Sequence, residues 1–141
     1  MEEGSEMSEE YVIPDGYHYT TEHEWARVQE DGTVLIGVTD YAQKQLHEIV
    51  YVELPEVGSE AEYMGVIGAV ESVKAVSDMN SPVAGTIVEV NKGLEDSPEL
   101  INESPHGEGW IAKLKPSNLD GDLARLMDPE AYGKYVAEQA H

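Results

Sequence analysis

Short apolar runs that are rich in β-branched residues predict a chain dominated by strands from residue 17 to residue 115. Residues 25–29 and 33–38 form two such runs around Glu30, Asp31 and Gly32, and turn residues at this spacing indicate a β-hairpin. Further runs of the same kind predict additional strands. They cover residues 17–20, 49–54, 85–90 and 110–115.

A second hairpin is predicted around a single lysine in residues 65–85. Two apolar runs flank Lys74, and Gly, Ser, Asn and Pro residues stand at the outer ends of the segment. This pattern is typical of two short strands joined by a turn, with Lys74 at or near that turn. Judged by spacing alone, such a lysine is most often only a solvated charge.

Helical periodicity is confined to one internal segment and to the C-terminal region. Thr39 and Asp40 offer a helix N-cap, and Gln43 is spaced to complete a capping box from Asp40. The apolar face of this short helix would consist of residues at i, i+4 and i+7. These are Ala42, Leu46 and Ile49.

The region after residue 93 is predicted to be mostly loop up to residue 109, with one helical turn over residues 98–101. Pro116 and Ser117 are expected to start a helix that has one leucine face. Asp128 followed by Pro129 predicts a second start, because proline is favoured at the first helical position. The core-facing residues of the two helices would be Leu119, Leu123, Leu126, Tyr132, Tyr135 and Val136.

This order of elements favours one mostly-β domain with appended helices. An antiparallel β-sandwich or flattened barrel, with one short inserted helix and two C-terminal helices, fits the pattern. The chain of 141 residues is long enough for a single core. We assign residues 1–14 to an acidic, disordered tail, because Met1–Glu10 is too polar to offset the entropy of ordering, and residues 15–141 to the domain.

The charge of the chain limits its partners. The sequence has 29 acidic and 8 basic side chains, for a formal net charge of −21. Such a surface would repel nucleic acids and anionic membranes. The excess acid either steers basic partner enzymes or adapts the protein to a salty cytosol that screens self-repulsion. No secretory or transit signal precedes the domain, so a cytoplasmic protein is expected.

The sequence carries no recognisable catalytic or metal-binding motif. There are no cysteines, so disulfides, thiolate metal sites and cysteine nucleophiles are excluded. His23 and His47 each lack a second histidine four residues later, which a zinc-protease motif would need. Any thiol chemistry must therefore come from a bound cofactor, and the chain is not expected to be an enzyme by itself.

Several motifs, in a fixed order, give Lys74 a more specific interpretation. ESVKA at residues 71–75 and NSPVAG at residues 80–85 closely resemble the lipoyl-lysine segment of the glycine cleavage system H protein family. Other segments resemble the same family and together cover roughly residues 16–136. They are HEW at 23–25, IGVTDYAQ at 36–43, VELP at 52–55, LIN at 100–102, SP at 104–105, GW at 109–110 and KLKP at 113–116.

This resemblance implies a hybrid lipoyl-type sandwich and a role for four side chains. Lys74 would carry lipoate as an amide, and Glu71 would be read by the lipoate-attaching enzyme. Glu24 and Asp78 would contact the aminomethyl-bearing arm, because paired carboxylates retain a primary ammonium. Val73 and Ala75 stand beside the lysine where biotin carriers have methionine, and this difference argues against biotin.

The resemblance also implies a set of partners. A pyridoxal-phosphate glycine decarboxylase would load the arm of the carrier, expected to be a monomer. An aminomethyltransferase would pass the carbon to tetrahydrofolate, and dihydrolipoamide dehydrogenase would reoxidise the arm with FAD and NAD. Two alternatives stay open: a lipoyl depot that supplies other acceptors, and an unmodified interaction module. The intact Lys74 motif argues against the module but does not exclude the depot.

Overall fold

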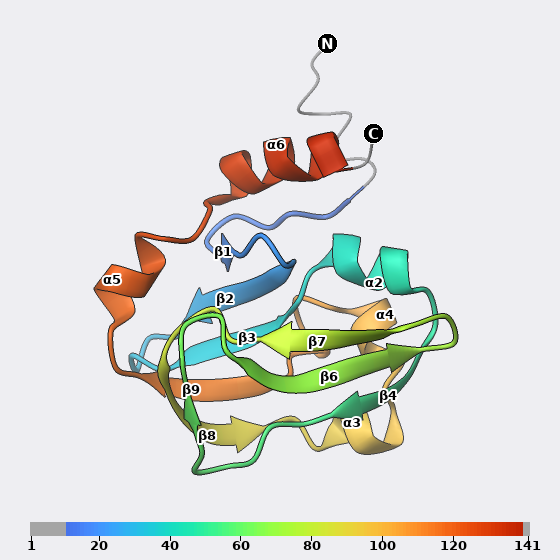
Figure 1. The fold of residues 1–141 in the computed structure, drawn as a ribbon, viewed down its shortest axis with the longest axis horizontal. Coiled ribbons are helices and arrows are strands. Elements are labelled where there is room, and N and C mark those ends of the chain that lie inside the picture. The colour runs from blue at the N-terminus through green and yellow to red at the C-terminus, as the bar shows by residue number, and fades with distance from the viewer. Residues whose placement is uncertain (1–10, 140–141) are drawn as a thin grey trace.

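Two antiparallel β-sheets enclose the main core in the computed structural model, which describes residues 11–139 (Figure 1). The larger sheet has six strands in the order β1-β2-β3-β9-β8-β5. These strands are β1 (His18–Tyr19), β2 (Glu24–Val28), β3 (Val34–Val38), β9 (Ala112–Pro116), β8 (Gly85–Val90) and β5 (Glu60–Ala61). The smaller sheet has the order β4-β6-β7. Its strands are β4 (Ile49–Glu53), β6 (Val66–Ser72) and β7 (Val76–Asn80).

This arrangement confirms the predicted sandwich with appended helices, but the sheets do not close into a barrel. Both predicted hairpins are present, because β2 pairs with β3 and β6 pairs with β7. Gly32, in the first turn, has a φ of +91°, a conformation that glycine adopts without steric cost. The strand predicted at residues 85–90 has the bounds of β8.

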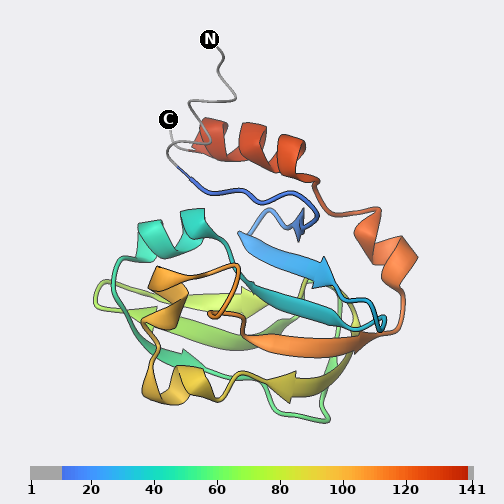
Figure 2. The ribbon, with the colours of Figure 1, turned by 180° about the vertical axis from the view of Figure 1, so that it is seen from behind.

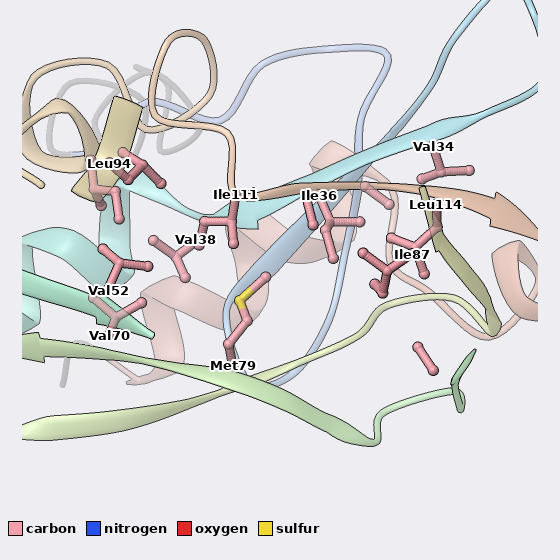
Figure 3. Packing of buried hydrophobic residues seen from close by; sticks show 14 of the residues in the cluster. Val34, Ile36, Val38, Val52, Val70, Met79, Ile87, Leu94, Ile111 and Leu114 are labelled. Carbon is pink, nitrogen blue, oxygen red and sulfur yellow. The ribbon is translucent and has the colours of Figure 1, made fainter. Parts of the chain in front are cut away.

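The main core lies between the sheets. Both sheets contribute apolar residues that are almost completely buried (Figure 3). The larger sheet supplies Val34, Ile36, Ile87 and Leu114, and the smaller one supplies Val52, Val70 and Met79. Burial of such side chains contributes about 1.5–3 kcal/mol each, so this layer holds the two sheets together.

The inserted helix α2 (Asp40–Leu46) forms where predicted, and of the two residues that offered an N-cap, Thr39 rather than Asp40 is the cap. Its hydroxyl accepts from the backbone N–H of Ala42 at 3.2 Å. Gln43 donates from its side chain to Asp40 Oδ1 at 2.8 Å. The expected capping box from Asp40 is therefore wrong, because the helix begins one residue earlier than that box requires. Asp40 instead lies in the first turn, where a carboxylate complements the helix dipole.

The C-terminal half differs from the prediction in two places. Residues 93–109 contain two short helices, α3 (Gly93–Asp96) and α4 (Leu100–Glu103); α4 overlaps the helical turn expected over residues 98–101, and α3 was not predicted. Helix α5 (Leu119–Leu123) begins after its N-cap Asn118 rather than at Pro116. Pro116 is paired with Gly85 in the sheet, so β9 continues through the position where a helix was expected.

Helix α6 (Pro129–Gln139) begins at the predicted proline, and Asp128 Oδ1 accepts from the N–H of Ala131 at 2.8 Å. The helix covers β1 at one end of the sandwich (Figure 2). Its residues Tyr132 and Val136 are buried, as predicted, in a second cluster that is mainly aromatic. The other buried members of that cluster are Tyr19, Trp25 and Tyr41.

The residues just before the domain pack against it. Met1–Glu10 of the expected tail lies outside the described residues. Tyr11 and Ile13 pack against the aromatic cluster, and the N–H of Val12 donates to Asp40 Oδ2 at 2.9 Å. The packed part of the chain therefore includes residues 11–14, which had been assigned to the tail. No helix within residues 11–139 is long and apolar enough to cross a bilayer.

Candidate functional site

Lys74 occupies the turn between β6 and β7, at the position predicted for it. The side chain of Ser72 organises this turn, because its hydroxyl accepts from the backbone N–H groups of Lys74 at 3.1 Å and Ala75 at 3.0 Å. The N–H of Ser72 in turn donates to the carbonyl of Ala75 at 2.8 Å. These local bonds give Lys74 a defined backbone position at the tip of the hairpin.

Two further contacts attach this tip to the body of the domain. The N–H of Val73 donates to the carbonyl of Glu48 at 3.0 Å. The Nζ of Lys74 donates to the carbonyl of Gln45, near the end of α2, at 3.3 Å. Lys74 and its two neighbours are nevertheless exposed. The amine is therefore within reach of an external enzyme while its backbone is braced.

Glu71 lies beside the tip on a row of three paired residues. It pairs with Tyr51 of β4 on one side and with Val76 of β7 on the other. Tyr51 and Val76 are large apolar side chains that are 54% and 65% exposed. Lys74 is thus approached over a surface that combines one carboxylate with two apolar side chains.

Glu24 is almost completely buried, with 1% of its surface exposed. Its Oε1 accepts from the hydroxyl of Thr20 at 2.5 Å, and its Oε2 accepts from the backbone N–H of Asn80 at 2.9 Å. Burial raises the pKa of this carboxyl from 4.5 to about 7, in spite of the two hydrogen bonds. Both of its oxygens already have protein partners.

Asp78 is exposed on β7, where it pairs with Ala69 of β6. It lies on the same strand as Asn80, two residues before the backbone group that Glu24 binds. Glu24 and Asp78 were expected to lie close together in the fold. The structure brings their strands together, but in the described part of the chain no hydrogen bond connects the two side chains.

Ser72, Thr20 and Asn80 also shape the site, although the sequence did not single them out. Ser72 carries a local signal, because a serine that precedes a turn commonly bonds to backbone N–H groups two or three residues later. Thr20 and Asn80 carry no such signal. Their link through Glu24 joins segments that are 56 residues apart along the chain.

Within residues 11–139, no group of three His, Asp or Glu side chains is arranged to hold a metal ion. His23 and His106 lie among aromatic rings, and burial lowers the pKa of each to about 4. His23 Nδ1 is 2.8 Å from the hydroxyl of Tyr132. These histidines are therefore part of the packed aromatic region.

The sequence of the chain is similar to those of known proteins of one family. The family model described as "Glycine cleavage H-protein" matches residues 17–139. The chain belongs to the glycine cleavage H-protein family. A probable glycine cleavage system H protein of Thermococcus gammatolerans is 61% identical over 127 residues, which are 90% of this chain and 94% of that protein. The glycine cleavage system H protein of Thermus thermophilus is 53% identical over 128 residues, which are 91% and 98% of the two chains.

A solved structure supports the same assignment. The crystal structure of a glycine cleavage system H protein from Mycobacterium marinum matches with a TM-score of 0.80 at 34% identity. The match covers 92% of this chain and 100% of that one. As a member of the H-protein family, this chain is a non-catalytic lipoyl carrier component of the glycine cleavage system.

The site fits the cofactor that this family carries. An amide with a carboxylic acid such as lipoate requires a primary amine that an attaching enzyme can surround, and Lys74 offers one at an exposed tip.

Proposed function

We propose that this chain carries lipoate as an amide on Lys74 and shuttles the aminomethyl group of glycine between enzymes. It would receive the group from a pyridoxal-phosphate glycine decarboxylase and deliver it to a tetrahydrofolate-dependent aminomethyltransferase. Dihydrolipoamide dehydrogenase, with FAD and NAD, would then reoxidise the arm. The observation that carries this proposal is the exposed amine of Lys74 on a braced hairpin tip.

Bound lipoate would supply a disulfide that accepts the aminomethyl group, which the cysteine-free chain cannot do by itself. The protein contributes position. Ser72 fixes the backbone of the turn, and Glu48 accepts from Val73, so the base of the arm starts from one defined point. A tethered group is presented to each enzyme at a high effective concentration set by the length of the tether.

Glu71 is proposed as a recognition group for the lipoate-attaching enzyme. It lies on β6, half-buried, between the exposed side chains of Tyr51 and Val76. An enzyme that reached Lys74 along this face would meet one carboxylate between two apolar contacts. Such a row offers both a charge-assisted hydrogen bond and apolar burial.

The resemblance implies that two carboxylates contact the arm, and we propose a different role for each of them. The carboxylate of Asp78 is exposed and makes no hydrogen bond within residues 11–139, so it is proposed to accept from the ammonium of the loaded arm. Glu24 is proposed to stabilise the same part of β7 from the buried side, because it accepts a hydrogen bond from the N–H of Asn80, two residues from Asp78. A direct contact between Glu24 and the arm would require this carboxylate, which is 1% exposed, to become accessible.

The test is Lys74→Arg, which keeps the positive charge but removes the amine that can form an amide. The variant should fold, take up no lipoate by intact mass, and support no glycine cleavage with purified partner enzymes. Lys92→Arg is the matched control, since Lys92 is also exposed but lies in the segment between β8 and α3. Lipoylation or glycine cleavage that persisted in Lys74→Arg would refute the carrier assignment to this residue.

A further inference from the structure

We propose that Asn102 is a positioning residue for Lys74, acting through the segment between α2 and β4. The inference rests on the proposed role of Lys74 as the attachment site. Figure 1 places the β6–β7 turn, α2 and α4 at the same end of the molecule, and Figure 2 shows the same grouping from behind. Asn102 belongs to α4, which is distant from the lysine hairpin in sequence.

The side chain of Asn102 binds three points of one short stretch of chain. Its Nδ2 donates to Gln43 Oε1 at 2.9 Å and to the carbonyl of His47 at 2.8 Å. Its Oδ1 accepts from the backbone N–H of Ile49 at 2.9 Å. One partly buried amide therefore ties the end of α2 to the first residue of β4.

The segment that Asn102 binds contains one residue with an unfavourable backbone conformation. His47, the C-cap residue of α2, has a φ of +69° and a ψ of −145°. This region of conformational space is almost restricted to glycine, and other residues persist there only when their surroundings hold them. The bonds from Asn102 to the two sides of His47 supply that restraint, so without them the stretch should relax.

The same stretch supports the lysine turn from outside. Glu48, next to His47, accepts from the N–H of Val73 at 3.0 Å, and Gln45 accepts from the Nζ of Lys74 at 3.3 Å. These are the two contacts that attach the tip to the domain. Asn102 is thus connected to Val73 and Lys74 through its hydrogen bonds to Gln43, His47 and Ile49 and through the intervening backbone, which carries the two acceptors of the tip.

Loss of this support should affect recognition rather than chemistry. We expect an attaching enzyme to bind only those molecules in which the tip is ordered. Its apparent affinity for the carrier then falls in proportion to the fraction of molecules that have an ordered tip. The amine of Lys74 itself would be unchanged. Removing Asn102 should therefore raise the KM of the carrier for lipoate attachment while leaving kcat unaltered.

The experiment compares Asn102→Ala with Asn91→Ala in the full-length, unmodified chain. Asn91 is the matched control because its partly buried amide also makes three bonds, to the backbone of Glu108, Trp110 and Gly93. Asn102→Asp, which keeps an acceptor for Ile49 but loses both donors, is the second variant if the alanine variant does not fold.

The first measurement is amide hydrogen exchange, which needs no lipoate. Exchange at Val73 should become about tenfold faster in Asn102→Ala, as expected when the bond to Glu48 opens locally. It should stay at the wild-type rate in Asn91→Ala. Unchanged exchange at Val73 in both Asn102 variants would overturn the proposal.

The second measurement is attachment of lipoate by a purified ATP-dependent lipoate ligase at varied carrier concentration. We expect KM to rise about fivefold or more in Asn102→Ala with kcat unchanged, and neither to change in Asn91→Ala. An equal effect of both variants, or a fall in kcat alone, would also overturn the proposal. If wild-type protein took no lipoate at Lys74, the proposed function would fail, and exchange at Val73 would still decide the structural inference.

Discussion

Glu24 on β2 accepts a hydrogen bond at 2.9 Å from the backbone N–H of Asn80 on β7, so a buried carboxyl connects the two sheets. The bond is made at the end of the strand that leaves the lysine turn. Thr20 completes the arrangement, because its hydroxyl donates to the other oxygen of Glu24 and accepts from the N–H of Glu24 at 3.1 Å.

The first prediction concerns the stability that this connection provides. Glu24→Ala would leave the N–H of Asn80 and the hydroxyl of Thr20 without their acceptor, at a cost of about 2–4 kcal/mol. Urea unfolding of the unmodified protein measures the loss. The control is Glu53→Ala, an exposed glutamate of β4 whose removal should change stability by no more than about 0.5 kcal/mol. Equal stability of the two variants would contradict the structural role of Glu24.

A second prediction concerns pH. Because burial raises the pKa of Glu24 to about 7, above the 4.5 of the exposed group, the folded state binds this proton more tightly than the unfolded state. Its contribution to stability is therefore complete below pH 4.5 and is lost as pH rises through 7. A shift of this size corresponds to about 3 kcal/mol.

Other buried groups oppose this trend. The pKa of both His23 and His106 is lowered to about 4, so their contribution is present above pH 6.5 and is lost as pH falls toward 4. The test is therefore the difference between wild type and Glu24→Gln in free energy of unfolding from pH 4.5 to 8. Relative to the variant, wild type should become less stable as pH rises. A pH-independent difference would show that Glu24 has an ordinary pKa.

The third prediction concerns the contact of α6 with the rest of the domain. The buried hydroxyl of Tyr132 lies 2.7 Å from Thr39 Oγ1 and 2.8 Å from His23 Nδ1. Tyr132→Phe keeps the ring that stacks on Tyr19 but removes this hydrogen-bond partner from His23 Nδ1 and leaves Thr39 Oγ1 with only the N–H of Ala42. Stability should fall by about 1–3 kcal/mol in urea unfolding.

The control for this substitution is Tyr63→Phe. The Tyr63 ring packs under the guanidinium of Arg125, and phenylalanine would keep that contact. Little change is expected there. If Tyr132→Phe were as stable as this control, the two hydrogen bonds of Tyr132 would contribute nothing to the docking of α6.

Local sequence patterns predicted the parts of this fold that depend on neighbours along the chain. The hairpin with Glu30–Gly32, the β8 strand and the start of α6 at Pro129 each combine a periodic run with an adjacent turn or cap residue. The helix expected at Pro116 failed because the pairing of Pro116 with Gly85, 31 residues away, extends β9. No pattern near Pro116 records that pairing.

In the candidate site, too, features set by neighbouring residues could be predicted and features set by distant residues could not. Lys74 and its turn could be placed from a short motif, since both strands of the hairpin lie next to it in sequence. The burial of Glu24 could not, because in a chain with 29 acidic residues a glutamate is expected on the surface. Its hydrogen-bond partners, Thr20 and Asn80, come together only when the two sheets pack.

The last prediction concerns Asp78, the exposed carboxylate proposed to hold the loaded arm. A charge-assisted hydrogen bond to the ammonium is worth about 1.5–3 kcal/mol. If that bond is lost as ammonia leaves, removing it should speed release about tenfold or more. Asp78→Asn should therefore load normally but lose ammonia faster than wild type when no aminomethyltransferase is present.

The matched control for Asp78→Asn is Glu53→Gln, which makes the same change of charge on the same sheet. Glu53 and Asp78 pair with Ala69 from opposite sides, so they lie in one row on different strands. A time course of the loaded carrier by intact mass compares their rates. Because screening of the overall charge would affect both variants alike, only a specific contact with the arm predicts faster release in Asp78→Asn alone. Release at the wild-type rate in both variants would show that Asp78 is an ordinary surface carboxylate.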